Sequence, residues 1–147
     1  MTAEIGTMRV TEQIDALETL SYDPLAALVV PRLLAATLML PILTILADAV
    51  GVSSGFFIAV AATDITFNDF AEGVRLAFGV FQVTYSLMKA TFFGMAIAFV
   101  CTYEGYITSA GAEGVGRSTA RAVVITSVAI LVLDAITAFL FAPFLQA

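Results

Sequence analysis

The chain has 147 residues, of which 61% are hydrophobic and 12% are charged, and its formal net charge is −6. Because about a quarter of the residues in soluble domains are charged, this composition excludes an ordinary soluble domain and favours insertion into a membrane. The acidic balance argues against a nucleic-acid-binding protein, since such proteins neutralise phosphate with Lys and Arg. With no His and a single Cys, Cys101, we expect neither a zinc site nor a disulfide framework.

The first predicted element is an amphipathic helix over residues 5–20. Acidic residues occupy one side of its helical wheel, so the helix suits a protein partner better than an anionic lipid surface. Pro24 pushes Asp23 out of the helical region and ends this predicted cytoplasmic segment, residues 1–23. The apolar side, predicted to dock the partner, consists of Val10, Ile14, Leu17 and Leu20.

Residues 24–147 form the predicted membrane region. It contains three apolar runs long enough to cross a hydrocarbon core of roughly 30 Å, at about 33–50, 84–104 and 118–141. Residues 51–62 either prolong the first span or turn back as a re-entrant segment. Pro41 should kink the first span, because it cannot donate a hydrogen bond to Thr37. The expected fold is an all-α, multipass transmembrane bundle of about three spans.

The distribution of arginines predicts the orientation of these spans. Arginines cluster before the first and third spans, whereas the 63–83 loop contains only Arg75. The positive-inside rule therefore places the N-terminus and the 105–118 loop in the cytoplasm. The 63–83 loop and the C-terminus are expected to face outward.

Three ionisable residues, Asp48, Lys89 and Asp134, lie inside the apolar runs. Their offsets from the cytoplasmic ends place all three roughly 20–24 Å up the spans, at similar depth. One cation and two anions at one depth can pair, which removes most of the cost of burying them. In the structural alternative, each residue forms an ion pair or snorkels to the interface. In the functional alternative, the three form a polar lining or a coupling network in a transport path.

The second span carries small residues at four-residue spacing, namely Ala90, Gly94 and Ala98. Such a face lets another helix approach closely. The partner is either a helix of the same chain or a second copy of the protein.

The run GAEGVGRS at residues 111–118 mimics the glycine spacing of a phosphate loop. The chemistry does not match, because Arg117 stands where the loop needs Lys and a membrane span precedes it. We expect Gly111, Gly114 and Gly116 to form a flexible cytoplasmic turn. Ser118 or Thr119 should then cap the third span, with Arg117 and Arg121 anchoring its inner end.

Two further residues near this turn, Glu104 and Glu113, are expected to be solvated loop charges. No His or metal cluster is present to organise Ser, Asp and Glu into a hydrolytic site, so we do not expect an enzyme.

Three segments resemble the MlaE/YrbE-type permeases, the membrane subunits of lipid-transporting ABC systems. They read EIGTMRVTEQIDALETLSYDPLAALVVPRLLA, LMKATFFGMAIAFVCTYEGY and GAEGVGRSTARAVVITSVAILVLDAITAFLF. The resemblance covers most of residues 4–141 and is weakest over 53–82. Family members normally carry an interfacial helix and further spans before this point. Met1 is therefore expected to reflect a truncated gene model, an internal start or a fragment.

The resemblance implies a homodimer in the bacterial inner membrane that works with two cytoplasmic ATPase subunits. ATP would be bound by those subunits, so this chain itself needs no cofactor. It also implies an outer-side lipid-shuttle protein and a phospholipid or similar hydrophobic cargo, with the 5–20 helix as the coupling helix. Two other functions stay open: a non-transporting scaffold or inactive fragment, and an ion-coupled secondary transporter that uses the three intramembrane charges.

Overall fold

The computed structural model describes residues 1–109 and 111–145, and every regular element in these ranges is helical. Two short helices come first, α1 (Thr2–Val10) and α2 (Gln13–Thr19). The long helices are α3 (Val30–Ala62), α5 (Val80–Tyr106) and α6 (Gly111–Leu145), and the shorter α4 (Phe67–Ala77) lies between α3 and α5 in the sequence. All three long helices are long and apolar enough to cross a membrane. The predicted all-α multipass fold is therefore confirmed.

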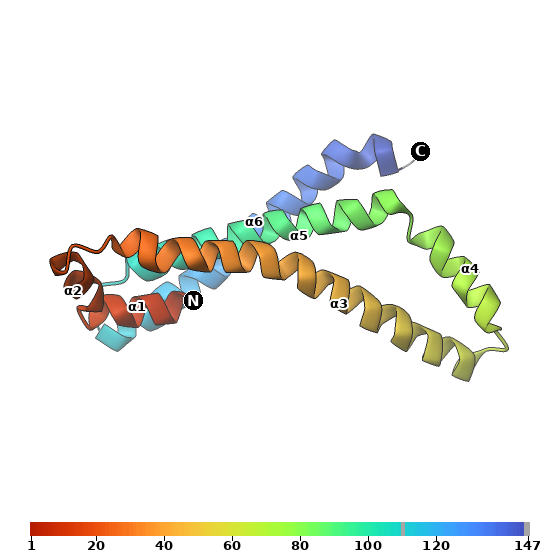
Figure 1. Ribbon diagram of the computed structural model, residues 1–147, viewed down its shortest axis with the longest axis horizontal. Coiled ribbons are helices and arrows are strands. Elements are labelled where there is room, and N and C mark those ends of the chain that lie inside the picture. The colour runs from red at the N-terminus through yellow and green to blue at the C-terminus, as the bar shows by residue number, and fades with distance from the viewer. Residues whose placement is uncertain (110, 146–147) are drawn as a thin grey trace.

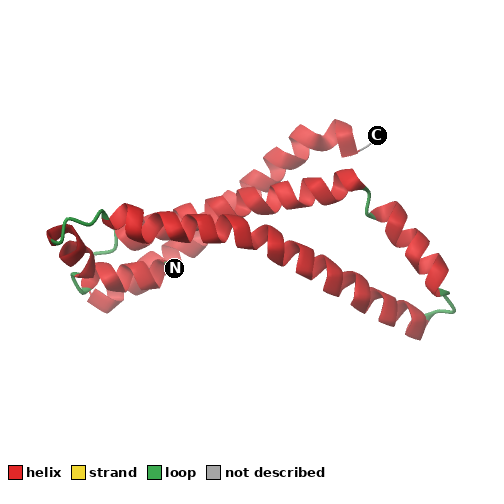
Figure 2. Ribbon diagram, viewed as in Figure 1, coloured by secondary structure: helices red, strands yellow, loops and turns green. Residues whose placement is uncertain are grey.

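The long helices are packed together at one end and splayed at the other. At the packed end, α1 contacts both α5 and α6, and α2 lies beyond it (Figure 1). Towards the other end α3 bends away from α5, and α4 connects the two separated tips. Only short loops join the helices in the described ranges (Figure 2).

Among the side chains that the structure describes, very few apolar ones are buried. The buried ones are Ile5, Ile14, Ala98, Val115 and Ala122, and no residue of α3 is buried. Large leucine, isoleucine and phenylalanine side chains are exposed along α3 and α6. A soluble monomer rarely exposes an apolar surface of this extent, so lipid is the natural solvent for these helices.

The predicted single helix over residues 5–20 is wrong, because the segment is broken into α1 and α2. Thr11 ends α1, and Glu12 has a φ of 58°, in the left-handed region. That conformation interrupts the right-handed helix, so the two halves point in different directions. The wheel that aligned the four apolar residues assumed an unbroken helix.

The first span begins with a π-helical turn at Leu25–Val29, just after Pro24. The Leu25 backbone N–H donates a 2.9 Å hydrogen bond to the Asp23 side chain, which fixes this entry. Pro31 follows in the first turn of α3, and because it has no N–H it interrupts the regular hydrogen-bond ladder where the wider turn occurs.

The open question of residues 51–62 is resolved in favour of continuation. The α3 helix runs unbroken through Gly51 and Gly55 to Ala62, so the stretch is not re-entrant. Its 33 residues give a length of about 50 Å, longer than a hydrocarbon core of roughly 30 Å. Figure 1 shows α3 bending within its length, and Pro41 is the proline inside this helix.

The 63–83 segment is not simply a loop, because it contains α4. Thr66 caps this helix in a capping box with Asp69, in which each side chain bonds the other residue's backbone N–H. The third span also starts earlier than expected, since α6 already begins at Gly111.

Candidate functional site

The α1 helix is an integral part of the packed end of the bundle. Ile5 and Thr2 are buried, and the Thr2 hydroxyl donates a 3.0 Å hydrogen bond to the Cys101 backbone carbonyl of α5. A Cβ added to Gly105 would lie 2.9 Å from the Ile5 Cβ. This close approach explains the glycine and means that α1 cannot act as a free surface helix.

The four predicted docking residues consequently differ in accessibility. Ile14 is buried, Val10 and Leu17 are half-buried, and Leu20 is 68% exposed. Of the four, Leu20 is the one that the structure presents fully to a partner. Tyr22 is similarly exposed just beyond it, a residue that the wheel did not include.

One ion pair links α1 to α3, and a second links α1 to α2. Glu4 and Arg32 form a 2.6 Å pair that links α1 to the start of α3. Arg9 pairs with Asp15 at 2.6 Å and lies over the Tyr106 ring, 5.8 Å from its centroid. The α1–α2 corner is therefore held by contacts to α3 and α5.

A pocket of about 580 Å³ lies beside this corner, between the α1–α2 turn and the end of α5. It is lined by Arg9, Val10, Glu12, Asp15, Tyr106, Ile107, Thr108, Ser109 and Gly111. Val10, the last residue of α1, therefore faces this pocket.

The predicted glycine-rich turn lies mostly inside α6. Gly111 has a φ of 68° and begins the helix, so Gly114, Gly116 and Arg117 are helical. A Cβ on Gly114 would collide with the Ser109 carbonyl oxygen, so this glycine permits a close approach of the α5–α6 connection. The run is thus neither a flexible turn nor a phosphate loop.

The predicted cap at residues 118–119 is also wrong, since both residues lie within the helix. Thr119 donates a hydrogen bond to the Val115 carbonyl one turn earlier, as a residue inside a helix does.

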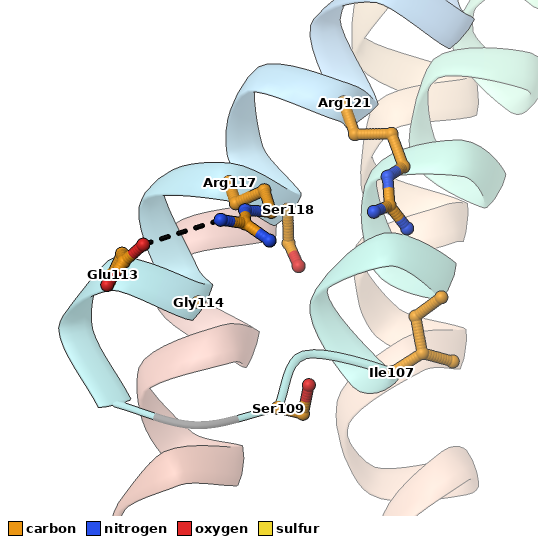
Figure 3. A pocket seen from close by; sticks show the side chains of 7 residues that line it. All are labelled: Ile107, Ser109, Glu113, Gly114, Arg117, Ser118 and Arg121. Carbon is orange, nitrogen blue, oxygen red and sulfur yellow. Dashed lines mark hydrogen bonds and ion pairs between the residues drawn. The ribbon is translucent and has the colours of Figure 1, made fainter.

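Two arginines of α6 border a second pocket, of about 310 Å³, at the same end of the bundle (Figure 3). Arg117 forms a 3.4 Å ion pair with Glu113, and the Arg121 side chain reaches towards α5. The remaining lining comes from Ile107, Ser109, Gly114 and Ser118.

Glu104 was expected to be a solvated loop charge, and this prediction is wrong. The residue is only 3% exposed, because it lies in the last turns of α5 where α1 and α6 pack. A guanidinium nitrogen of Arg121 lies 3.9 Å from the Oε2 atom of Glu104. That oxygen accepts no hydrogen bond within the described part of the chain. Buried carboxylate oxygens normally accept hydrogen bonds, so the charge of Glu104 depends on Arg121 for its compensation.

Of the three ionisable residues predicted to lie within the membrane, Lys89 of α5 forms an ion pair with Asp134 of α6. The Lys89 ammonium also lies 5.7 Å from the centroids of the Tyr85 and Phe93 rings. Asp48 on α3 has no ion-pair partner among the described residues. The structure therefore brings together two of the three predicted charges.

The small-residue face of α5 is directed at the same chain. A Cβ on Gly94 would lie 2.7 Å from the Ala36 carbonyl oxygen of α3, and Ala98 is fully buried. Ala90 lies on the same face, one turn before Gly94, and is half-buried. Close packing of α3 on α5 accounts for Gly94.

Comparison with known proteins gives these features a family context. The family model of the permease MlaE matches residues 1–140. A probable ABC transporter permease of Rickettsia prowazekii is 42% identical over 130 residues, which cover 88% of this chain and 50% of the relative. A probable ABC transporter permease of Synechocystis is 45% identical over 130 residues, covering 88% and 49%.

A plant protein is also similar. TRIGALACTOSYLDIACYLGLYCEROL 1 of the Arabidopsis thaliana chloroplast is 36% identical over 132 residues, covering 90% of this chain and 38% of the relative. The chain spans about half the length of the bacterial relatives that it matches. The chain belongs to the MlaE permease family.

Proposed function

We propose that the chain forms part of a permease that moves phospholipid or a similar hydrophobic molecule, driven by a separate cytoplasmic ATPase. Family membership supports the transport role, because the bacterial relatives carry the name ABC transporter permease. A lipid cargo is supported by the plant relative, whose name is that of a galactolipid. The proposed location is the bacterial inner membrane, with α1 and α2 at the cytoplasmic end.

The observation that carries the ATPase partnership is the contrast between α1 and α2. The α1 helix is packed against α5 and α6, whereas α2 and the turn after it expose Leu20 and Tyr22. Exposed acidic residues lie next to these apolar residues in the sequence, Glu18 before Leu20 and Asp23 after Tyr22. An apolar centre with a charged rim is typical of a protein-docking surface, so α2 is proposed as the coupling element.

The Lys89–Asp134 pair is proposed to line the path of the lipid. Ionisable residues inside apolar helices are rare and usually mark a transport pathway. A pair that joins α5 to α6 also has the position needed to respond when these two helices move. Asp48 is left out of this proposed pair, because the structure gives it no ion-pair partner among the described residues.

The assembly is proposed to contain a second permease copy and an outer-side lipid-shuttle protein. ATP binding and hydrolysis can drive such a system only if the ATPase contacts α2 differently in its two nucleotide states, because equal contacts shift no equilibrium. Transport itself then depends on apolar walls and needs no covalent step in this chain.

Replacement of Leu20 by Asp tests the docking surface. We expect Leu20→Asp to abolish co-purification with the cognate ATPase and ATP-dependent transfer of a fluorescent phospholipid between proteoliposomes and acceptor vesicles. Leu76→Asp is the matched control, since Leu76 is equally apolar and exposed but lies on α4 at the other end. Full ATPase recovery with Leu20→Asp would contradict docking through α2, and transfer that needs no ATP would contradict the proposed function.

A further inference from the structure

We infer that the pocket between the end of α3 and α4 binds one acyl chain of a phospholipid, and that Arg75 binds the phosphate of the same molecule. The inference requires the long helices to span a membrane but does not require the ATPase. It concerns the splayed end of the bundle, opposite to α1 and α2.

The pocket has a volume of about 500 Å³ and its walls are almost entirely carbon. On the α3 side it is lined by Val52, Phe56 and Phe57. The Phe56 ring lies 5.4 Å, between centroids, from the rings of both Phe67 and Phe70 on α4, in edge-to-face geometry. These aromatic contacts form the wall where the two helices meet, and the hollow beside them suits a flexible hydrocarbon chain.

The sequence of α4 places this apolar wall on one face. Phe67, Phe70, Ala71 and Val74 follow the i, i+3, i+4, i+7 spacing of an amphipathic helix, and all four line the pocket. The opposite face carries exposed polar residues such as Asn68 and Glu72. A helix of this kind lies in the plane of a membrane interface, with its apolar face towards the acyl chains.

Arg75 supplies the second half of the recognition. It lines the same pocket from the last turn of α4. The other five Lys and Arg side chains each form an ion pair with a carboxylate, whereas Arg75 has no ion-pair partner in the part of the chain that the structure describes. A guanidinium group binds phosphate oxygens with two parallel hydrogen bonds.

Together these features match the chemistry of a phospholipid. An inorganic phosphate ion would make no use of the aromatic walls, and a purely apolar molecule would leave the guanidinium unpaired. The depth also fits, because Phe56 lies 24 residues beyond Arg32, about 36 Å along the helix and so near the far interface. Under the orientation proposed above, the lipid would belong to the outer leaflet.

Tryptophan fluorescence provides a direct test, since the chain contains no Trp. Phe57→Trp places a reporter in the pocket, and Ile58→Trp places one at the next position of α3, which is 68% exposed and does not line the pocket. Each variant is incorporated into nanodiscs of an unbrominated diacyl glycolipid, which carries no phosphate, with an increasing share of phospholipid brominated in its acyl chains. We expect quenching of Phe57→Trp to approach its maximum at a low share, and quenching of Ile58→Trp to rise in proportion to the share.

Identical curves for the two reporters would overturn the inference, because they would show only the lipid that surrounds any membrane protein. If Phe57→Trp does not insert stably, Phe70→Trp reports from the α4 wall of the same pocket.

Arg75→Gln, added to the reporter variant, tests the phosphate contact. We expect the share of brominated lipid needed for half-maximal quenching to rise about tenfold, because a charge-assisted hydrogen bond is lost. Arg117→Gln makes the same change of charge at the other end and should leave the curve unchanged, and added inorganic phosphate should not displace the lipid. An unchanged curve with Arg75→Gln would overturn the role of Arg75, and displacement by inorganic phosphate would overturn the assignment of the acyl chain.

Discussion

Ile5 of α1 lies directly against Gly105 of α5, so closely that a Cβ on Gly105 would be 2.9 Å from the Ile5 Cβ and 2.9 Å from the Thr2 carbonyl oxygen. Backbone and a β-branched side chain form this contact, and neither can move aside as the end of a long side chain could. The packed end of the bundle therefore depends on the absence of a side chain at position 105.

Gly105→Ala should destabilise the protein by about 1–3 kcal/mol, because the added methyl group forces α1 away from α5. The measurement is the apparent melting temperature of the purified protein in detergent. Gly51→Ala is the control, since a Cβ there meets nothing within 4 Å and alanine favours a helix. Equal melting temperatures for both variants would argue against a tight α1–α5 contact.

Lys89→Met should also lower the melting temperature, because it leaves Asp134 without its partner in an apolar layer. Adding Asp134→Asn should recover part of the loss, whereas adding Asp48→Asn should not. This double-mutant comparison isolates the pair. Purely additive losses with Asp134→Asn would show that the two residues do not interact in the membrane.

The same double variant separates structural from functional roles of the pair. If Lys89 and Asp134 line the lipid path, Lys89→Met with Asp134→Asn should fold and bind the ATPase but transfer phospholipid slowly in proteoliposomes. Full transfer activity at recovered stability would make the pair structural only.

Arg121→Met should destabilise the protein more than Glu104→Gln does. The first change removes the cation that pairs with a buried carboxylate, whereas the second removes the charge itself and keeps the shape. In a Glu104→Gln background, Arg121→Met should have little further effect on the melting temperature. A loss of the same size in both backgrounds would show that Arg121 acts independently of Glu104.

The orientation is tested by cysteine labelling in a Cys101→Ser background. Ser109→Cys should react with a membrane-impermeant maleimide only from the cytoplasmic side, and Asn68→Cys only from outside. Both positions are exposed, so access to the thiol is not limiting. The reverse pattern would invert the proposed topology.

The long helices could be predicted from the sequence because their signal is local: each apolar run is long enough to cross a membrane. The break between α1 and α2 could not be predicted in this way. It accompanies the packing of α1 against Gly105 and Thr108, about a hundred positions away in the sequence. A helical wheel has no access to such contacts, which is why Ile14 was assigned to a docking face and is instead buried.

The α4 helix, by contrast, was detectable. Thr66 and Asp69 have capping-box spacing, and Phe67, Phe70 and Val74 repeat with the helical period. The sequence could not show that Lys89 pairs with Asp134 and not with Asp48, because the choice depends on how each helix is rotated about its axis. Depth along a span can be counted from the sequence, but rotation is set by packing.

The close contact between Gly94 and Ala36 has a mechanical consequence for α3. From Ala36, α3 extends about 9 Å back to Val30 but about 39 Å forward to Ala62. The helix is thus a lever with a short arm beside α2 and an arm roughly four times longer at the splayed end. Any small tilt imposed near α2 would be multiplied at the tip that carries α4.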